Sequence, residues 1–283
     1  MSTRKLLSGI VLLSGTALAA CATPGETSNE GEVSAETAAD ALSQIPATGL
    51  SKEQLKANVR RLTSEDTAQN DVSRLGATRT RLNPVIADLA RLYKSQPVAK
   101  ELESGLAGTW KQLWTDDYRA APPGAPKADA SSIFQVVTGS YIYNFSNQII
   151  PTPPGAPKVV VGSFLRAAES VSPGSSVLDI VFTRLGILPT ALPAPALIAQ
   201  LAKDIESGTV ASGGPPGVGG PPGPGGPPGA GAPPGSRGPI GVKGKLRNLY
   251  LDGDLRVVIG GTEDQNYNKV FILERVAPSP SSR

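Results

Sequence analysis

Few side chains in this sequence can do covalent chemistry, and the most distinctive one lies near the start of the chain. Cys21 is the single cysteine of the 283 residues, and the sequence contains no histidine. Leu-Ala-Ala directly precedes Cys21, at the end of an apolar run over residues 6–20 that follows Arg4 and Lys5. A basic start, a short apolar segment and small residues before a cleavage site are typical of an export signal. The sequence therefore predicts a signal peptide over residues 1–20.

Residues 18–21, Leu-Ala-Ala-Cys, resemble the lipobox of bacterial lipoproteins. This resemblance implies that the Cys21 thiol receives a diacylglycerol, that the chain is cut before Cys21, and that the new amine is acylated. Two or more acyl chains, at about 0.8 kcal/mol per buried CH₂, hold a protein stably on a membrane. Ala22 in place of Asp implies the outer membrane, with the protein facing the periplasm. The alternatives are an ordinary secretory signal with an incidental cysteine, or a retained anchor, for which the apolar run is shorter than the roughly 20 residues required.

The residue types that are missing exclude several classes of enzyme. Once Cys21 carries lipid, the mature chain has neither thiol nor imidazole, which excludes disulfides, histidine metal sites, Ser-His-Asp triads and cysteine nucleophiles. The sequence contains no phosphate-binding loop and no GxSxG motif. We therefore expect no enzymatic activity, no cofactor and no bound metal, with a carboxylate or Ser-Lys enzyme acting on lipid as the alternative.

The charge of the mature chain is nearly balanced. Removal of Arg4 and Lys5 with the signal peptide leaves 25 basic residues against 24 acidic ones. Nucleic-acid-binding domains usually carry a basic excess gathered on one face. No nucleic-acid partner is therefore expected, and the expected partners are membrane lipids, reached through acylated Cys21, and an apolar lipid ligand.

Three segments have compositions that favour disorder. Residues 21–50 are rich in Ala, Thr, Ser, Gly and Glu and predict a lipidated, disordered tether. Residues 209–244 consist mainly of Gly and Pro and predict a disordered insertion. Because Gly recurs there at nearly every third position, a collagen-like triple helix is the alternative. A short tail, 277–283, ends the chain.

Residues 51–104 are expected to be helical. Ser51 with Gln54 three residues later forms a capping box, which predicts the start of a first helix. Ser64 can cap a second helix, and Asn83-Pro84 predicts the cap and first position of a third.

From residue 105 to 276 the pattern changes to short β-rich runs separated by Gly and Pro. Asp252-Gly253 between two of these runs indicates a tight hairpin, and a helix is expected at 196–207, with Leu197, Leu201 and Ile205 on one face and Gly208 at its end. Eight such runs predict an antiparallel β-barrel or sandwich. They are 108–114, 133–137, 140–145, 158–165, 176–183, 245–251, 254–259 and 269–276.

These runs resemble the plastid-lipid-associated protein (fibrillin) family. The resemblance is strongest at YLDGDLRV (250–257) and VFIL (270–273), and it includes GTWKQLWT (108–115), Ile133-Phe134-Gln135 and Asn83-Pro84. The chain departs from the family at the Gly/Pro insertion and in having a lipoprotein signal where the family has a transit peptide. The resemblance implies a mainly β fold, a lipocalin-like antiparallel β-barrel after an N-terminal helical segment. It also implies binding of carotenoids, prenylquinones or other neutral lipids.

Two further residues are expected to close one end of this barrel. Gly108-Thr109-Trp110 matches the G-x-W that opens lipocalin barrels, and Arg256 near the end of the chain is expected to lie over the Trp110 ring. Such a cation–π contact contributes about 0.5–2 kcal/mol, so the expected role of this pair is structural.

The expected function is a membrane-anchored lipoprotein whose barrel binds or organises apolar lipids. The alternative is a structural envelope lipoprotein whose barrel is packed and holds no ligand. An apolar cavity of some hundreds of cubic ångströms would favour the first. The side chains expected to line it are Tyr141, Tyr143, Phe145, Phe164, Ile180 and Phe182.

Overall fold

The computed structural model describes residues 35–66, 72–117, 127–210 and 240–277. The predicted signal peptide, Cys21, most of the Gly/Pro segment and almost all of the tail lie outside the described residues. The predictions made for those segments stay predictions.

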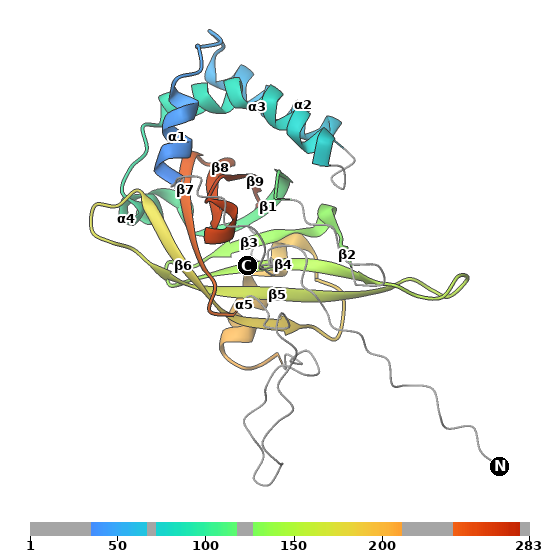
Figure 1. Cartoon of the computed structure of the whole chain (residues 1–283). Coiled ribbons are helices and arrows are strands. Elements are labelled where there is room, and N and C mark those ends of the chain that lie inside the picture. The colour runs from blue at the N-terminus through green and yellow to red at the C-terminus, as the bar shows by residue number, and fades with distance from the viewer. Residues whose placement is uncertain (1–34, 67–71, 118–126, 211–239, 278–283) are drawn as a thin grey trace, which may run out of the picture.

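Among the described residues, eight antiparallel strands close into a barrel, in the order β4-β3-β1-β9-β8-β7-β6-β5, with β5 paired back to β4 (Figure 1). The predicted barrel and all eight predicted runs are thereby confirmed. A two-residue strand, β2 (Lys127–Ala128), adds to β4 outside this ring. The barrel strands are β1 (Gly108–Thr115), β3 (Phe134–Val137), β4 (Tyr141–Ile150), β5 (Val159–Ser170), β6 (Val177–Ile187), β7 (Lys243–Leu251), β8 (Leu255–Thr262) and β9 (Lys269–Arg275).

Alternation along each strand decides which side chains enter the barrel. On β4, Ile142 packs in the interior cluster, whereas Tyr143 and Phe145 pack in a separate cluster outside. On β1, a bulge between Gln112 and Trp114 changes the facing, so that Gln112 reaches the interior and Trp114 packs outside. Both faces of the sheet are therefore buried over part of its area.

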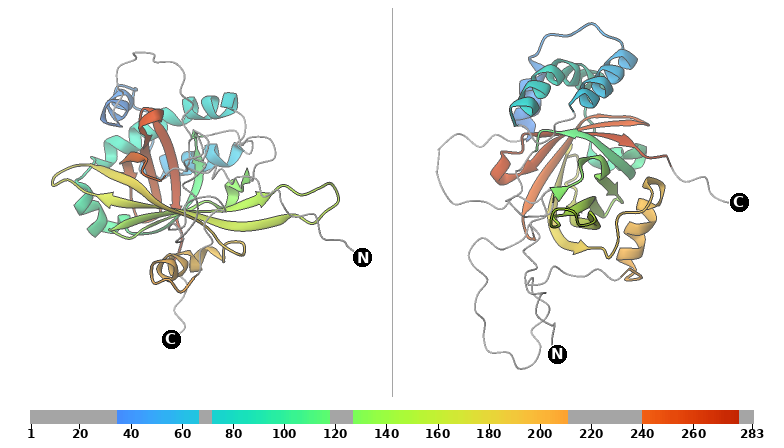
Figure 2. Two further views of the ribbon diagram at one scale, coloured as in Figure 1. Left: turned by 60° about the horizontal axis from the view of Figure 1, so that its bottom comes forward. Right: turned by 90° about the vertical axis from the view of Figure 1, so that its right-hand side faces the viewer.

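Three helices cover the outer face of β7, β8, β9 and β1. They are α1 (Ala35–Ser43), α2 (Lys52–Glu65) and α3 (Val72–Tyr93), and they lie together on one side of the barrel in both figures (Figures 1 and 2). Leu55 and Ile86 are fully buried against strand residues such as Val257. The predicted capping box at the start of α2 is present, with Gln54 N donating to Ser51 Oγ and Ser51 N donating to Gln54 Oε1.

Ion pairs fix α2 to the turn between β7 and β8. Lys56 Nζ lies 2.9 Å from Asp252 Oδ2 and also pairs with Asp254. Arg60 Nη2 lies 2.7 Å from Asp254 Oδ2. Arg60 Nε lies 2.9 Å from Glu274 Oε1, which extends the contact to β9. The predicted hairpin is present, with a turn over residues 252–254 that Asp252 stabilises by accepting from the amides of Asp254 and Leu255.

Two predictions about the helices are wrong. Residues 35–43 form α1 inside the segment expected to be a disordered tether, because Leu42 is buried against α3 and the barrel. The two helices expected from Ser64 and Asn83-Pro84 are replaced by α3, which runs through Pro84. An internal proline removes a helix hydrogen bond. The burial of Leu82 and Ile86 on either side offsets this loss.

On the opposite side of the barrel, α5 (Ile198–Glu206) covers the outer face of β3, β4 and β5. The predicted helix is present and ends at Glu206, and Gly208, with φ of +74°, lies just after its C-cap residue Ser207. Its buried face differs from the expected one: Leu197 is 50% exposed, and Ile198, Ala202 and Ile205 are buried. Because β7 begins at Lys243, the predicted insertion boundary at 244 lies inside the barrel.

The remaining helical elements are short. They are α4 (Val98–Glu101), η1 (Leu102–Leu106), η2 (Ala130–Ser132), η3 (Pro195–Leu197) and η4 (Glu263–Gln265). None of the described helices is both long and apolar enough to cross a membrane.

Candidate functional site

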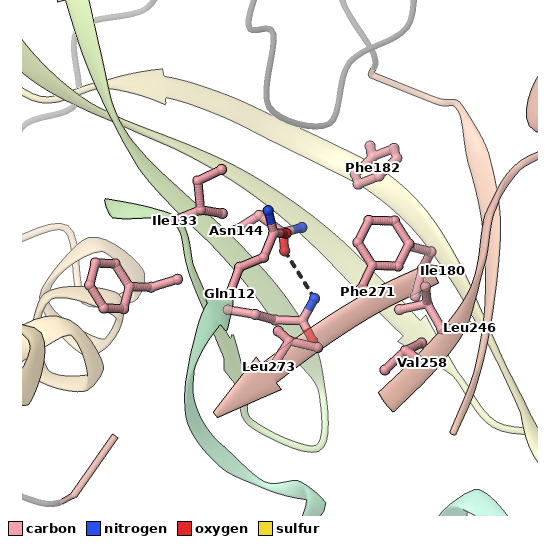
Figure 3. Close-up of a pocket in the computed structure, with 11 residues that line it drawn as sticks. Gln112, Ile133, Asn144, Ile180, Phe182, Leu246, Val258, Phe271 and Leu273 are labelled. Atoms are coloured by element: carbon pink, nitrogen blue, oxygen red, sulfur yellow. Dashed lines mark hydrogen bonds between the residues drawn. The ribbon is translucent and has the colours of Figure 1, made fainter. Parts of the chain in front are cut away.

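The barrel interior holds a cavity of about 30 Å³ (Figure 3). Three amide side chains, Gln112, Gln135 and Asn144, form part of its wall. Strands β6 to β9 contribute an apolar wall, and Figure 3 shows Ile180, Phe182, Leu246, Val258 and Phe271 of this wall gathered on one side of the cavity. This wall consists of Ile180, Phe182, Leu246, Val258, Phe271 and Leu273, and Ile133 and Phe134 complete the lining.

The size of this cavity limits what it can hold. A single water molecule needs a cavity of roughly 10–15 Å³, so this one has room for about two water molecules. Sites for drug-sized ligands usually measure about 300–1,000 Å³. The barrel as it stands therefore has no room for a carotenoid or quinone within this cavity.

A buried arginine organises the polar part of the interior. Arg256 on β8 is 1% exposed, and its Nε donates to Asn248 Oδ1 at 2.7 Å. Its guanidinium also donates to Gln135 Oε1, and Gln135 Nε2 in turn donates to Asn144 Oδ1 at 3.0 Å, the bond dashed in Figure 3. This chain of hydrogen bonds joins β7, β8, β3 and β4 across the inside of the barrel.

The network continues to the helices through Glu101 on α4, which is fully buried. Asn248 Nδ2 donates to one oxygen of Glu101, and the Tyr93 hydroxyl donates to the other at 2.8 Å. Burial raises the pKa of Glu101 above its usual value, although the two hydrogen bonds and the charge of Arg256 oppose this. Burial also lowers the pKa of Arg256 to about 10, still well above neutral pH.

A second carboxyl group, Glu169 on β5, is buried without a partner. It lies on the same face of β5 as Ala167, which packs in the barrel interior. Both of its carboxylate oxygens are buried, and neither has a hydrogen-bond partner among the described residues. Burial raises the pKa of Glu169 to about 7, although the charge of Arg256 opposes this.

One end of the barrel is closed by α4 and η1. Val98 and Leu106 pack with Trp110 in the interior cluster, and Trp110 Nε1 donates to the Leu106 carbonyl at 3.0 Å. The cation over the Trp110 ring is Arg275, whose Cζ lies 4.1 Å from the ring centroid. The expected pairing of Trp110 with Arg256 is therefore wrong, because Arg256 is held inside by the amide side chains.

The six residues expected to line a ligand cavity lie in two places. Ile180 and Phe182 line the interior cavity. Tyr143, Phe145 and Phe164 lie outside the barrel, in the cluster that α5 covers.

Tyr141, the sixth expected lining residue, also lies on the outer face. It is half-buried, and its ring lies 3.4 Å from Arg166 Cζ. These four residues were wrongly expected inside the barrel because alternating aromatic residues on β4 indicate a buried face, and here α5 buries that face from outside. Gln135 and Asn144 were missed because isolated amides in a strand are usually exposed.

The fold and interior define a class of protein: a closed eight-stranded antiparallel β-barrel of lipocalin-like form, preceded by helices and containing a buried polar network. Comparison of the chain with protein-family models, curated proteins and solved structures gives no match in any of the three. Within the described part of the chain, no group of three or more Asp, Glu, Cys or His side chains is placed to hold a metal ion.

We expect Arg256→Met to destabilise the protein by about 3–5 kcal/mol, because it leaves Glu101 and the amides buried without their cation. Chemical denaturation with urea measures this loss. Arg61→Met is the control, since Arg61 is an exposed arginine paired with Glu65 and should contribute no more than about 0.5 kcal/mol. A loss for Arg256→Met as small as that of the control would show that the network does not stabilise the barrel.

We expect Glu169→Gln to raise the melting temperature at pH 8 by about 3 °C or more and to leave it unchanged near pH 4.5. The pKa of Glu169 is about 7 in the folded protein, above its value of 4.5 in an unfolded chain. The folded state is therefore destabilised as the pH rises from 4.5 through 7, and this destabilisation is complete above pH 7. Thermal unfolding followed at several pH values measures the difference.

Glu206→Gln is the control of opposite sign. Partial burial raises the pKa of Glu206, but hydrogen bonds from Tyr143 and Arg166 outweigh this and lower it. This variant should therefore lower the melting temperature at pH 8. Equal effects of Glu169→Gln at both pH values would contradict the buried, uncompensated carboxylate.

Proposed function

We propose that this protein is a membrane-anchored envelope lipoprotein whose packed barrel serves as a rigid scaffold at the membrane and does not carry a ligand in its interior. The observation that supports this most directly is the interior itself: its cavity measures about 30 Å³, and Arg256 and its partners cross the lumen. Of the two functions that the sequence suggests, this is the structural one.

Support for the anchor comes from the N-terminal sequence. Leu-Ala-Ala at 18–20 ends the predicted export signal directly before Cys21, and two or more acyl chains on Cys21 suffice for a stable anchor. Residues 22–34 separate Cys21 from α1, a length that spans at most about 45–50 Å when extended. The barrel would therefore remain close to the bilayer, at the outer membrane if Ala22 is read as in other lipoproteins.

A scaffold role also agrees with the residue types present. The chain lacks histidine, and its one cysteine is the lipid attachment site in this proposal, so catalysis would depend on carboxylates, hydroxyls or lysines alone. The carboxyl groups of Glu101 and Glu169 are buried, so neither is exposed to a substrate in solution. We therefore propose no enzymatic activity.

Binding of an apolar lipid inside the barrel is the second candidate. The apolar wall formed by residues such as Phe182, Leu246 and Phe271 favours it. A lipid would have to expand the cavity about tenfold to reach the usual size of a ligand site. It would also have to displace side chains that pack at interior density, at a cost in stability.

A titration with a fluorescent apolar probe separates the two candidates. For a packed barrel we expect no saturable binding with a dissociation constant tighter than about 100 μM. Native mass spectrometry of the purified protein should show no co-purified lipid beyond the acyl chains on Cys21. A stoichiometric complex with a neutral lipid in that experiment would favour the second candidate.

We expect Cys21→Ser to prevent acylation and to change the processing of the precursor. Intact-mass measurement of the wild-type protein should show the added diacylglycerol and acyl mass at its N-terminus, and the variant should lack it. Membrane fractionation after washing with high salt and carbonate provides the second readout. A wild-type protein that is cleaved without acyl mass would overturn the anchor.

A further inference from the structure

The hairpin of β4 and β5 continues beyond the barrel as an arm, defined here as residues 148–161. It projects at the right of Figure 1 and of the left-hand view in Figure 2. The β4–β5 ladder runs outward to the pair Ile150 and Val159, whereas the neighbour β3 pairs with β4 only as far as Phe145. On the other side, β6 pairs with β5 only from Ser163 onward. The arm therefore extends past both neighbouring barrel strands.

The outer part of the arm is apolar on both faces. Directly opposed residues share a face, so Ile150 and Val159 lie on one side and Ile149 and Val160 on the other. Val159 is 45% exposed, and the other three are partly exposed. A two-stranded ribbon with water on both sides is usually polar, so this composition indicates a surface that becomes covered.

The loop at the end of the arm suits an apolar environment. Four of its seven residues, 151–157, are prolines and have no amide hydrogen, and Ala156 N donates to the Pro153 carbonyl at 3.0 Å. Loops are usually excluded from lipid because their unpaired backbone N–H groups lose hydrogen bonds to water there. The many prolines also disfavour pairing with a strand of another chain, as does β2, which occupies one edge of the arm.

The charge of this region fits a phospholipid surface. The arm itself contains no Asp or Glu, and Lys158, next to Val159, is exposed, whereas Asp129 lies at the base of the arm, where its backbone N donates to the Asn147 carbonyl at 2.8 Å. A basic residue beside apolar ones matches a bilayer interface, where anionic headgroups lie above the acyl chains.

We propose that the arm docks on the membrane to which the protein is anchored. Ile149, Ile150, Val159 and Val160 lie at the level of the headgroups and upper acyl chains, and Lys158 pairs with anionic phosphates. This proposal rests on the proposed lipid anchor at Cys21. Together, anchor and arm give the barrel two attachment points and thus a fixed orientation on the bilayer.

A single fluorescent label tests this contact in the intact acylated protein. Because acylation blocks Cys21, Val159→Cys introduces a unique thiol, which is labelled with nitrobenzoxadiazole after reconstitution in vesicles of zwitterionic and anionic phospholipids. We expect the label to emit at shorter wavelength and to be quenched by nitroxide-labelled lipids. The matched control is Leu92→Cys on α3, an apolar residue 56% exposed, whose label should remain in water.

Each outcome of this experiment decides between explanations. A protein that floats with the vesicles while the label at position 159 stays in water overturns the arm contact and leaves the anchor intact. A protein that does not float overturns the anchor and the arm contact with it. A spectral shift at position 159 that depends on protein concentration and occurs without vesicles would show contact with a second copy, which also overturns the proposal.

Charge reversal tests the role of Lys158. Lys158→Glu should reduce quenching of the label at position 159 in anionic vesicles and should have little effect in purely zwitterionic ones. Lys203→Glu is the control, since Lys203 is an exposed lysine on α5, away from the arm. Equal losses for both variants would show a general charge effect and contradict a specific contact at Lys158.

Discussion

The buried charge of Arg256 is the constraint on which much of this barrel depends. A guanidinium deprived of water needs partners for its donors, and the chain supplies them from opposite walls, Asn248 and Gln135. Asn248 also bonds Glu101, so the same arginine connects the strands to the helix that closes one end. These side chains cross the lumen and occupy the space that a large ligand would need.

The outer surface of the barrel is built by a different rule. Two helical layers bury opposite sides of the sheet, α1–α3 over β7–β9 and β1, and α5 over β3–β5. As a result, strands in these regions carry apolar side chains on both faces, which is unusual for antiparallel sheets. The arm carries apolar side chains on both faces too, but no helix covers it among the described residues. Because no described helix covers the arm, we propose that the membrane covers it.

The interior is packed and the apolar arm lies outside the barrel, so the proposed scaffold function concerns the surface of the molecule. Hydrogen bonds across the lumen join strands on both sides of the barrel, which suits the proposed role as a rigid scaffold at a membrane. The unpartnered carboxyl of Glu169 is the exception to this well-satisfied interior. Its raised pKa makes the interior less stable in alkaline conditions than near pH 5.

Local sequence determined the parts of this protein whose physics is local. The eight strand runs, the capping box of Ser51 and the termination of α5 just before Gly208 all depend on neighbouring residues and were predictable. Tertiary structure decided the rest. Alternation on β4 shows two faces but does not tell which is inside when α5 buries the outer one, and it cannot tell whether Arg256 or Arg275 reaches Trp110. Those choices depend on bulges, closure and distant partners, which act only once the barrel has formed.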